Sequence, residues 1–287
     1  MAAEDSSPTA VVIDRTARIV RAGPLQELSD DPIDRYSHHF IHVIERHLDA
    51  FERPVTALDL AAGTGMPSLS LLPKLPEGSR IIALSEDRAE LKLFHEQVPR
   101  ALAQSIYPRK EKRDHLPFAQ GVFDVAWAAL TREQFPTARL FFGPALRVLR
   151  KDAALLLATP LRPTFAELVT AIGPSLVGHE DDPAFAAMVA APPELLAAPS
   201  WAAELSRCGA VAVEVTEDSI ETQLSPPLSR QPLFTRHLLP VWLGGNAALQ
   251  EQALCLLDLT VREPIRALIH IGCIRGRRGP DPIPSAA

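Results

Sequence analysis

The sequence contains 287 residues, of which 47% are hydrophobic and 22% are charged, and its formal net charge is -6. This length suits one large α/β domain or two small ones, and the composition excludes an intrinsically disordered protein. The acidic balance argues against a nucleic-acid partner, which normally requires a basic face, and no stretch reaches the ~18–20 apolar residues of a membrane span.

Residues 1–29 are expected to form an N-terminal tail with a short strand or hairpin over residues 10–20, although helix or coil fits that segment nearly as well. From Asp30 to Phe51, apolar residues recur at intervals of three and four. This spacing predicts an amphipathic helix with Pro32 in its first turn.

Short apolar segments then alternate with helical ones. The predicted strands are residues 55–60, 80–84, 123–127 and 153–158, and the predicted helices are residues 67–75, 88–100 and 138–149. Strands that alternate with helices indicate an α/β protein with a Rossmann-like, doubly wound and mostly parallel sheet, covered by helices on both faces.

The remainder of the chain has a different composition. Residues 161–199 are rich in proline and alanine, which predicts a helical cap inserted over the strand ends. A helix is expected to end at Gly209, because glycine is favoured just past a helix C-terminus. Further predicted elements are strand segments at 211–215 and 220–224, a helix at 249–259 and a late strand at 267–274, and residues 279–287 are expected to be a disordered tail.

A glycine-rich turn, Asp59-Leu60-Ala61-Ala62-Gly63-Thr64-Gly65, follows the first predicted strand of the sheet. A strand that ends in an acid and turns through small residues into a helix lets backbone amides approach a ligand closely. Taken alone, the turn is as compatible with a tight strand-to-helix connection as with a nucleotide site.

The segment from Leu58 to Gly65 resembles the first motif of class I S-adenosylmethionine-dependent methyltransferases, usually written DxGxGxG. Three later segments resemble motifs of the small-molecule, type 11-like branch of that family in the same order: Leu116 to Ala126, Ala145 to Thr159 and Trp201 to Gly209. The resemblance implies S-adenosylmethionine as the cofactor, a late antiparallel strand, and one methyltransferase domain over residues 30–278 with residues 161–199 as its cap.

Roles in the turn follow from the same resemblance. Asp59 would orient the methionine amino end of the cofactor, directly or through water. Ala61, Gly63 and Gly65 would let the backbone pass beneath the methionine and the ribose, and Thr64 belongs to the same cofactor-binding turn.

The end of the second strand departs from the family pattern, which has an acid there that binds both ribose hydroxyls. The aligned residue is Ser85, and Glu86 follows it. Either Glu86 takes the ribose position after a one-residue adjustment, or Ser85 makes a weaker contact. Capping of the next helix by Ser85-Glu86-Asp87 is the alternative, and it is compatible with either ribose contact. Outright loss of the acid would weaken cofactor binding about ten- to a hundredfold.

Two further cofactor contacts are expected by resemblance. Asp114 is the candidate for the adenine amino group and His115 for a backbone contact, with a solvated charged loop as the alternative. Trp127, after the third strand, would present an aromatic face to the sulfonium, which suits a cation. Core packing explains Trp127 equally well.

No catalytic residue is identified by the sequence. Methyl transfer is an in-line displacement that mainly needs alignment, and a base is required only if the acceptor must lose a proton. Tyr36 and His39 lie about one helical turn apart and are the candidates for such a role.

The predicted activity is S-adenosylmethionine-dependent methyl transfer to a small, largely apolar molecule, with O-methylation favoured over N- or C-methylation. The alternatives are a methyltransferase-like binding or scaffold protein and a reductase that uses NAD(P). Cys208, Cys255 and Cys273 lack metal-ligand or disulfide spacing, so we expect no metal site and a reducing, cytoplasmic compartment. A homodimer is left open.

Overall fold

The computed structural model describes residues 10–14, 17–21, 32–131, 135–190 and 196–280. The predicted N-terminal tail therefore lies mostly outside the described residues, as does the C-terminal tail from residue 281 onward. Among the residues that are described, no helix is both long enough and apolar enough to cross a membrane.

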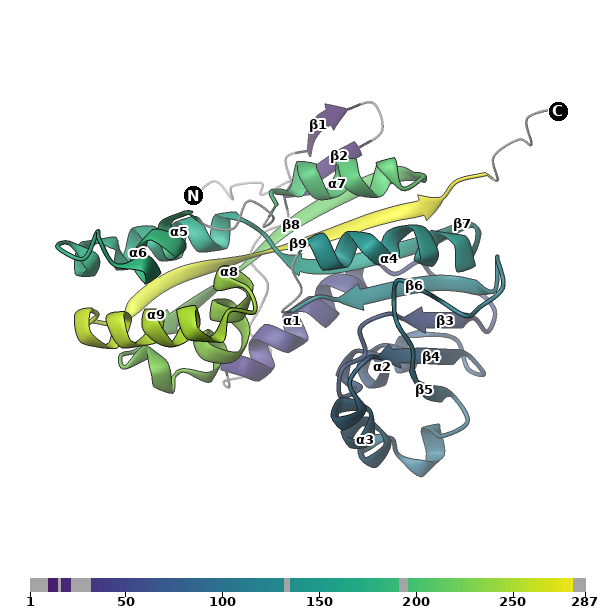
Figure 1. Cartoon of the computed structure of the whole chain (residues 1–287). Helices are drawn as coiled ribbons and strands as arrows, with labels where there is room; N and C mark the ends of the chain where they lie inside the picture. The colour runs from purple at the N-terminus through teal and green to yellow at the C-terminus, as the bar shows by residue number, and fades with distance from the viewer. Residues whose placement is uncertain (1–9, 15–16, 22–31, 132–134, 191–195, 281–287) are drawn as a thin grey trace, which may run out of the picture.

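The described strands form a nine-stranded sheet in the order β1-β2-β8-β9-β7-β6-β3-β4-β5 (Figure 1). The bounds are β1 Ala10–Asp14, β2 Ala17–Arg21, β3 Thr56–Asp59, β4 Arg80–Ser85, β5 Ile106–Lys110, β6 Phe123–Ala129, β7 Leu149–Pro160, β8 Ala210–Leu224 and β9 Ile265–Arg278. Strands β7, β6, β3, β4 and β5 pair in parallel, whereas β9 is antiparallel to both β7 and β8. The predicted mostly parallel sheet with a late antiparallel strand is confirmed.

Each face of the sheet buries its own hydrophobic core, because successive side chains of a strand point to opposite faces. In β6, Val125 and Trp127 belong to one core, whereas Ala126 and Ala128 belong to the other. Helices α1 (Pro32–His47), α2 (Met66–Leu71) and α3 (Arg88–Gln97) contribute to the first core. Helices α4 (Phe135–Val148) and α7 (Ala198–Arg207) contribute to the second, so the sheet is doubly wound.

A group of short helices lies beyond the carboxyl ends of the central strands (Figure 1). Helices α5 (Pro163–Ile172) and α6 (Pro183–Ala190) come from the segment predicted as a cap. Helix α6 packs with α8 (Leu239–Leu243) and α9 (Ala247–Thr260), and the indole N–H of Trp242 donates to the Met188 carbonyl at 2.9 Å. Helix α5 packs on β9, and its Phe165 ring lies 5.8 Å from the Trp242 ring. The cap is therefore helical, as predicted, but a later part of the chain completes it.

Strand β5 was not predicted, because Tyr107-Pro108-Arg109 carries polar, bulky and helix-breaking residues together. It pairs only with β4 and is the last strand of the described sheet on that side. A proline is tolerated at a sheet edge because its missing N–H is not needed by a further neighbour.

Strand β8 is continuous, although two separate strand segments were predicted on either side of Thr216 to Ser219. Those polar residues remain in the strand because they pair with residues 270–273 of β9. The buried carboxylate of Asp218 also forms an ion pair with Arg46 of α1, which offsets part of the cost of its burial.

Candidate functional site

The glycine turn is tied to the neighbouring strands by its backbone. The Leu60 N–H donates to the Trp127 carbonyl at 2.8 Å, and the Ala62 N–H donates to the Leu84 carbonyl at 2.9 Å. Because β6 and β4 flank β3, these bonds place the turn at the carboxyl edge of the sheet, where parallel α/β proteins bind their ligands.

The two glycines of the turn both have positive φ, but for different reasons. Gly65 has a φ of 99°, and a Cβ added there would overlap the ring of Phe94, which is buried in the core. Gly63 has a φ of 53°, and a Cβ added there would meet no atom within 4 Å. Packing therefore requires Gly65, whereas Gly63 faces open space.

Asp59 is completely buried behind the turn. Its carboxylate accepts the Ala61 N–H at 3.2 Å and the Ser68 hydroxyl at 2.7 Å, so it joins the end of β3 to α2. Burial raises the pKa of Asp59 to about 6, against the opposing effect of the hydrogen bonds from Ser68 and Ala61. These contacts are internal, and its predicted interaction with the methionine amino end stays a prediction.

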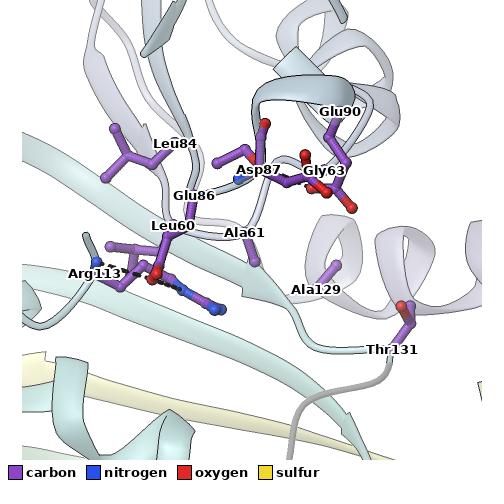
Figure 2. A pocket seen from close by; sticks show the side chains of 11 residues that line it. Leu60, Ala61, Gly63, Leu84, Glu86, Asp87, Glu90, Arg113, Ala129 and Thr131 are labelled. Atoms are coloured by element: carbon purple, nitrogen blue, oxygen red, sulfur yellow. Dashed lines mark hydrogen bonds and ion pairs between the residues drawn. The ribbon is translucent and has the colours of Figure 1, made fainter. Parts of the chain in front are cut away.

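A cavity of about 240 Å³ opens between the glycine turn, the end of β4, the start of α3 and the end of β6 (Figure 2). Its polar lining includes Ser85, Glu86, Glu90 and Arg113. Leu60, Ala61, Leu84 and Ala129 supply apolar surface, and Gly63 lies at its edge.

Ser85 and Glu86 have different partners in this cavity. The Ser85 hydroxyl donates to Glu90 at 2.8 Å and accepts the Asp87 N–H at 3.1 Å. Asp87 caps α3 through the Ala89 N–H, as the capping alternative for residues 85–87 allowed. Glu86 is exposed and binds Arg113, with 3.3 Å between Oε1 and Nε.

A second cavity of about 150 Å³ adjoins the first on the side of α1. The two cavities share residues 61, 63, 90, 129 and 131, so they are compartments of one depression. The remaining lining of the second compartment comes from α1, the turn, α2 and a later helix: Ser37, Ile41, Ala62, Thr64, Met66, Pro67 and His237.

The two residues considered for catalysis, Tyr36 and His39, are buried on α1 and line neither compartment. The Tyr36 hydroxyl donates to the Thr131 carbonyl at 3.0 Å. Its ring also lies 5.0 Å from the ring of His237. Tyr36 therefore positions two residues that do line the second compartment.

Asp114 and His115 are exposed and outside both linings; their neighbour Arg113 lines the first compartment instead. The Arg113 guanidinium also lies 5.7 Å from the centre of the Phe141 ring. Trp127 is fully buried in the core behind the turn and lines neither compartment, so its position fits core packing rather than contact with a sulfonium.

Two residues that line the site were underestimated from the sequence: Glu90 was not considered, and His237 was ranked below the residues of the first helix as a catalytic candidate. Glu90 follows Ser85 by five residues and lies in the first turn of α3. This position next to the end of β4 could have indicated from the sequence that Glu90 lies near Ser85. His237 lies in a one-turn π-helix, Phe234–Leu238, far along the chain. Only the tertiary fold brings it to the glycine turn.

Comparison with known proteins identifies a methyltransferase domain over residues 58–157. No curated protein matches the sequence. Among solved structures, the chain is similar to the YcgJ protein from Bacillus subtilis, with 14% identity, a TM-score of 0.57, and coverage of 85% of this chain and 99% of that one. A candidate methyltransferase (BH2331) from Bacillus halodurans C-125 has 15% identity, a TM-score of 0.55, and coverage of 85% and 100%. The [4+2]-cyclase SpnF has 16% identity, a TM-score of 0.51, and coverage of 86% and 82%.

Proposed function

We propose that this chain, whose residues 58–157 match a methyltransferase domain, is a class I S-adenosylmethionine-dependent methyltransferase that methylates a small, largely apolar molecule held in the second compartment. The observation that carries this proposal is the shared lining of the two compartments around Gly63. A cofactor in the first compartment and an acceptor in the second would meet beside the glycine turn.

The residues of the first compartment fit S-adenosylmethionine. Gly63 leaves the space above the turn open, and Ser85 and Glu90 offer hydroxyl and carboxylate groups to a polyhydroxyl ligand. When bound, the cofactor supplies a methyl group activated by a positively charged sulfur. The protein's part is to hold and align the reactants, which accounts for much of the rate enhancement in bimolecular transfers.

The second compartment favours an acceptor of limited polarity. Ile41, Met66 and Pro67 supply apolar surface, and Ser37 and Thr64 supply hydroxyl groups. His237 adds an imidazole, the side chain best suited to accept a proton near neutral pH. We therefore favour an acceptor hydroxyl, whose proton His237 would take, over a nitrogen or carbon acceptor.

Binding of S-adenosylhomocysteine tests the cofactor site without knowledge of the acceptor. A ligand at a hundred times its Kd stabilises a folded protein by about 2.7 kcal/mol, so we expect the melting temperature to rise by roughly 5 °C. Differential scanning fluorimetry measures this shift. No shift at millimolar ligand would contradict the proposed function.

Gly63→Ala is the matched variant for that measurement. Its methyl group would enter the open space over the turn without meeting another atom, while the positive φ would reduce stability by about 1–2 kcal/mol. We expect a folded variant with little or no shift on adding S-adenosylhomocysteine. A shift as large as that of the wild type would place the cofactor away from Gly63.

Mass spectrometry can identify the methyl acceptor. Small molecules that co-purify with the protein can be identified, and then incubated with S-adenosylmethionine and fresh enzyme. A methylated oxygen in the product supports the proposed acceptor class. Methylation of nitrogen or carbon would contradict the preference for oxygen and leave methyl transfer itself established.

A second candidate function is a methyltransferase-like protein that binds its ligand without transferring a methyl group. Two points favour it: by the family resemblance Ser85 stands where an acid is usual, and the similar structure SpnF is a [4+2]-cyclase. Such a protein would bind S-adenosylhomocysteine but form none from S-adenosylmethionine in the presence of its co-purified small molecule. Chromatographic detection of S-adenosylhomocysteine separates the two functions.

We also infer a cytoplasmic location. All three cysteines are free, and Cys255 is exposed, a state more typical of a reducing compartment than of an oxidising one. Burial raises the pKa of Cys273 to about 12, which makes that thiol unreactive.

A further inference from the structure

Glu90 occupies a central place in the depression. It lies in the first turn of α3 and is among the few residues that line both compartments. Figure 2 shows its side chain extending from α3 past Gly63 and toward the side of the cavity formed by Ala129 and Thr131. The half-buried carboxylate of Glu90 thus lies on the side of the glycine turn where Gly63 leaves open space.

Ser85 holds this carboxylate at the end of β4. The Ser85 hydroxyl donates to Glu90 Oε2 at 2.8 Å and is itself oriented by the Asp87 N–H at 3.1 Å. A carboxylate offers about four acceptor sites, so the bond from Ser85 is compatible with further donors on the same group. The pair presents an acceptor and a hydroxyl side by side.

Glu86, the rival acid, is oriented away from such a role. Its carboxylate accepts from the backbone N–H of Arg113 at 3.4 Å and from its guanidinium at 3.3 Å. Figure 2 shows this pair on the opposite side of the cavity from Glu90. To bind a ligand beside Gly63, Glu86 would have to leave Arg113.

We propose that Glu90, positioned by Ser85, binds the two neighbouring ribose hydroxyls of S-adenosylmethionine. The two residues have this role only if the cofactor site is as proposed above. Hydroxyl groups that donate to a carboxylate form short, charge-assisted hydrogen bonds, which are about twice as strong as neutral ones. A helix residue would then supply the acid that the strand end lacks.

Isothermal titration calorimetry with S-adenosylhomocysteine tests this assignment. We expect Glu90→Gln to weaken binding about ten- to a hundredfold, because the amide keeps the size of the side chain but removes its charge. Glu96→Gln removes the same charge from an exposed position of the same helix and serves as the matched control. Its affinity should equal that of the wild type.

The 2′-deoxy analogue of S-adenosylhomocysteine shows whether Glu90 acts on the ribose. Loss of the hydroxyl should weaken binding to the wild type and have little further effect on Glu90→Gln, because residues and ligand groups in contact are not additive. Equal weakening in both proteins would overturn the assignment, since Glu90 would then act on affinity through something other than that hydroxyl.

The outcomes separate this assignment from the proposed function. If the wild type does not bind S-adenosylhomocysteine, the proposed function fails and the ribose assignment fails with it. If the wild type binds and Glu90→Gln binds equally well, only the role of Glu90 is overturned. A loss confined to Glu86→Gln would transfer the ribose contact to Glu86.

Discussion

Gly65→Ala should lower the stability of the protein by about 3–5 kcal/mol, because the new methyl group would overlap a packed ring and occupy a left-handed backbone. The ring belongs to Phe94, which is fully buried, so it cannot move aside without disturbing the core beneath the turn. Thermal unfolding should show a melting temperature about 6–9 °C below that of the wild type.

Gly143→Ala is the control for this variant. Gly143 lies in α4, is exposed, and has no atom within 4 Å of an added Cβ. Alanine stabilises a helix interior by roughly 0.5–1 kcal/mol relative to glycine, so this variant should melt at or above the wild-type temperature. If Gly65→Ala unfolds like Gly143→Ala, contact with Phe94 is not the reason for a glycine at position 65.

The second large effect concerns the pH dependence contributed by Asp59. Burial raises the pKa of this carboxyl from 3.8 to about 6, so the folded state binds more protons than the unfolded state between those values. Stability contributed by the protonated group is therefore lost as pH rises from about 4 to about 6, by about 3 kcal/mol in total.

Asp59→Asn removes this titration and keeps the size of the side chain. The stability of the variant relative to the wild type should increase by about 3 kcal/mol as pH rises from 4 to 7. Urea unfolding at a series of pH values measures the difference. A stability difference that stays constant, or that changes in favour of the wild type as pH rises, would mean that burial does not raise the pKa of Asp59.

Asp59→Ala separates the charge from the hydrogen bonds. It leaves the Ala61 N–H and the Ser68 hydroxyl without their acceptor, which costs about 1–3 kcal/mol relative to Asp59→Asn at every pH. Because those bonds hold the turn against α2, we also expect this variant to lose its thermal shift with S-adenosylhomocysteine. Retention of the full shift would show that the turn keeps its shape without Asp59.

The central part of the fold was predictable from local patterns. The strands β3, β4, β6 and β7 are short apolar segments between helical ones, and each was predicted within a few residues of its ends except β7, which is longer at its start. Alternation of strands and helices permits few arrangements, because parallel strands need crossover helices on the faces of the sheet.

Other elements depended on partners distant in the chain. The polar middle of β8 does not resemble a strand, yet its pairing with β9 and the ion pair between Asp218 and Arg46 hold it in the sheet. Similarly, β5 is a strand because β4 offers it a free edge. Neither partner is visible in the local sequence.

The candidate site divides in the same way. The sequence by itself determined the glycine turn, since the positive φ of Gly63 and Gly65 favours glycine, and it indicated Ser85 as the point of departure from the methyltransferase motif pattern. The tertiary structure alone decided which carboxylate lies beside Gly63. Glu86 and Glu90 are the same residue type, and only the directions of their side chains distinguish them. It also brought His237 to the second compartment, where packing against Tyr36 of α1 holds a residue that no local pattern connects to the turn.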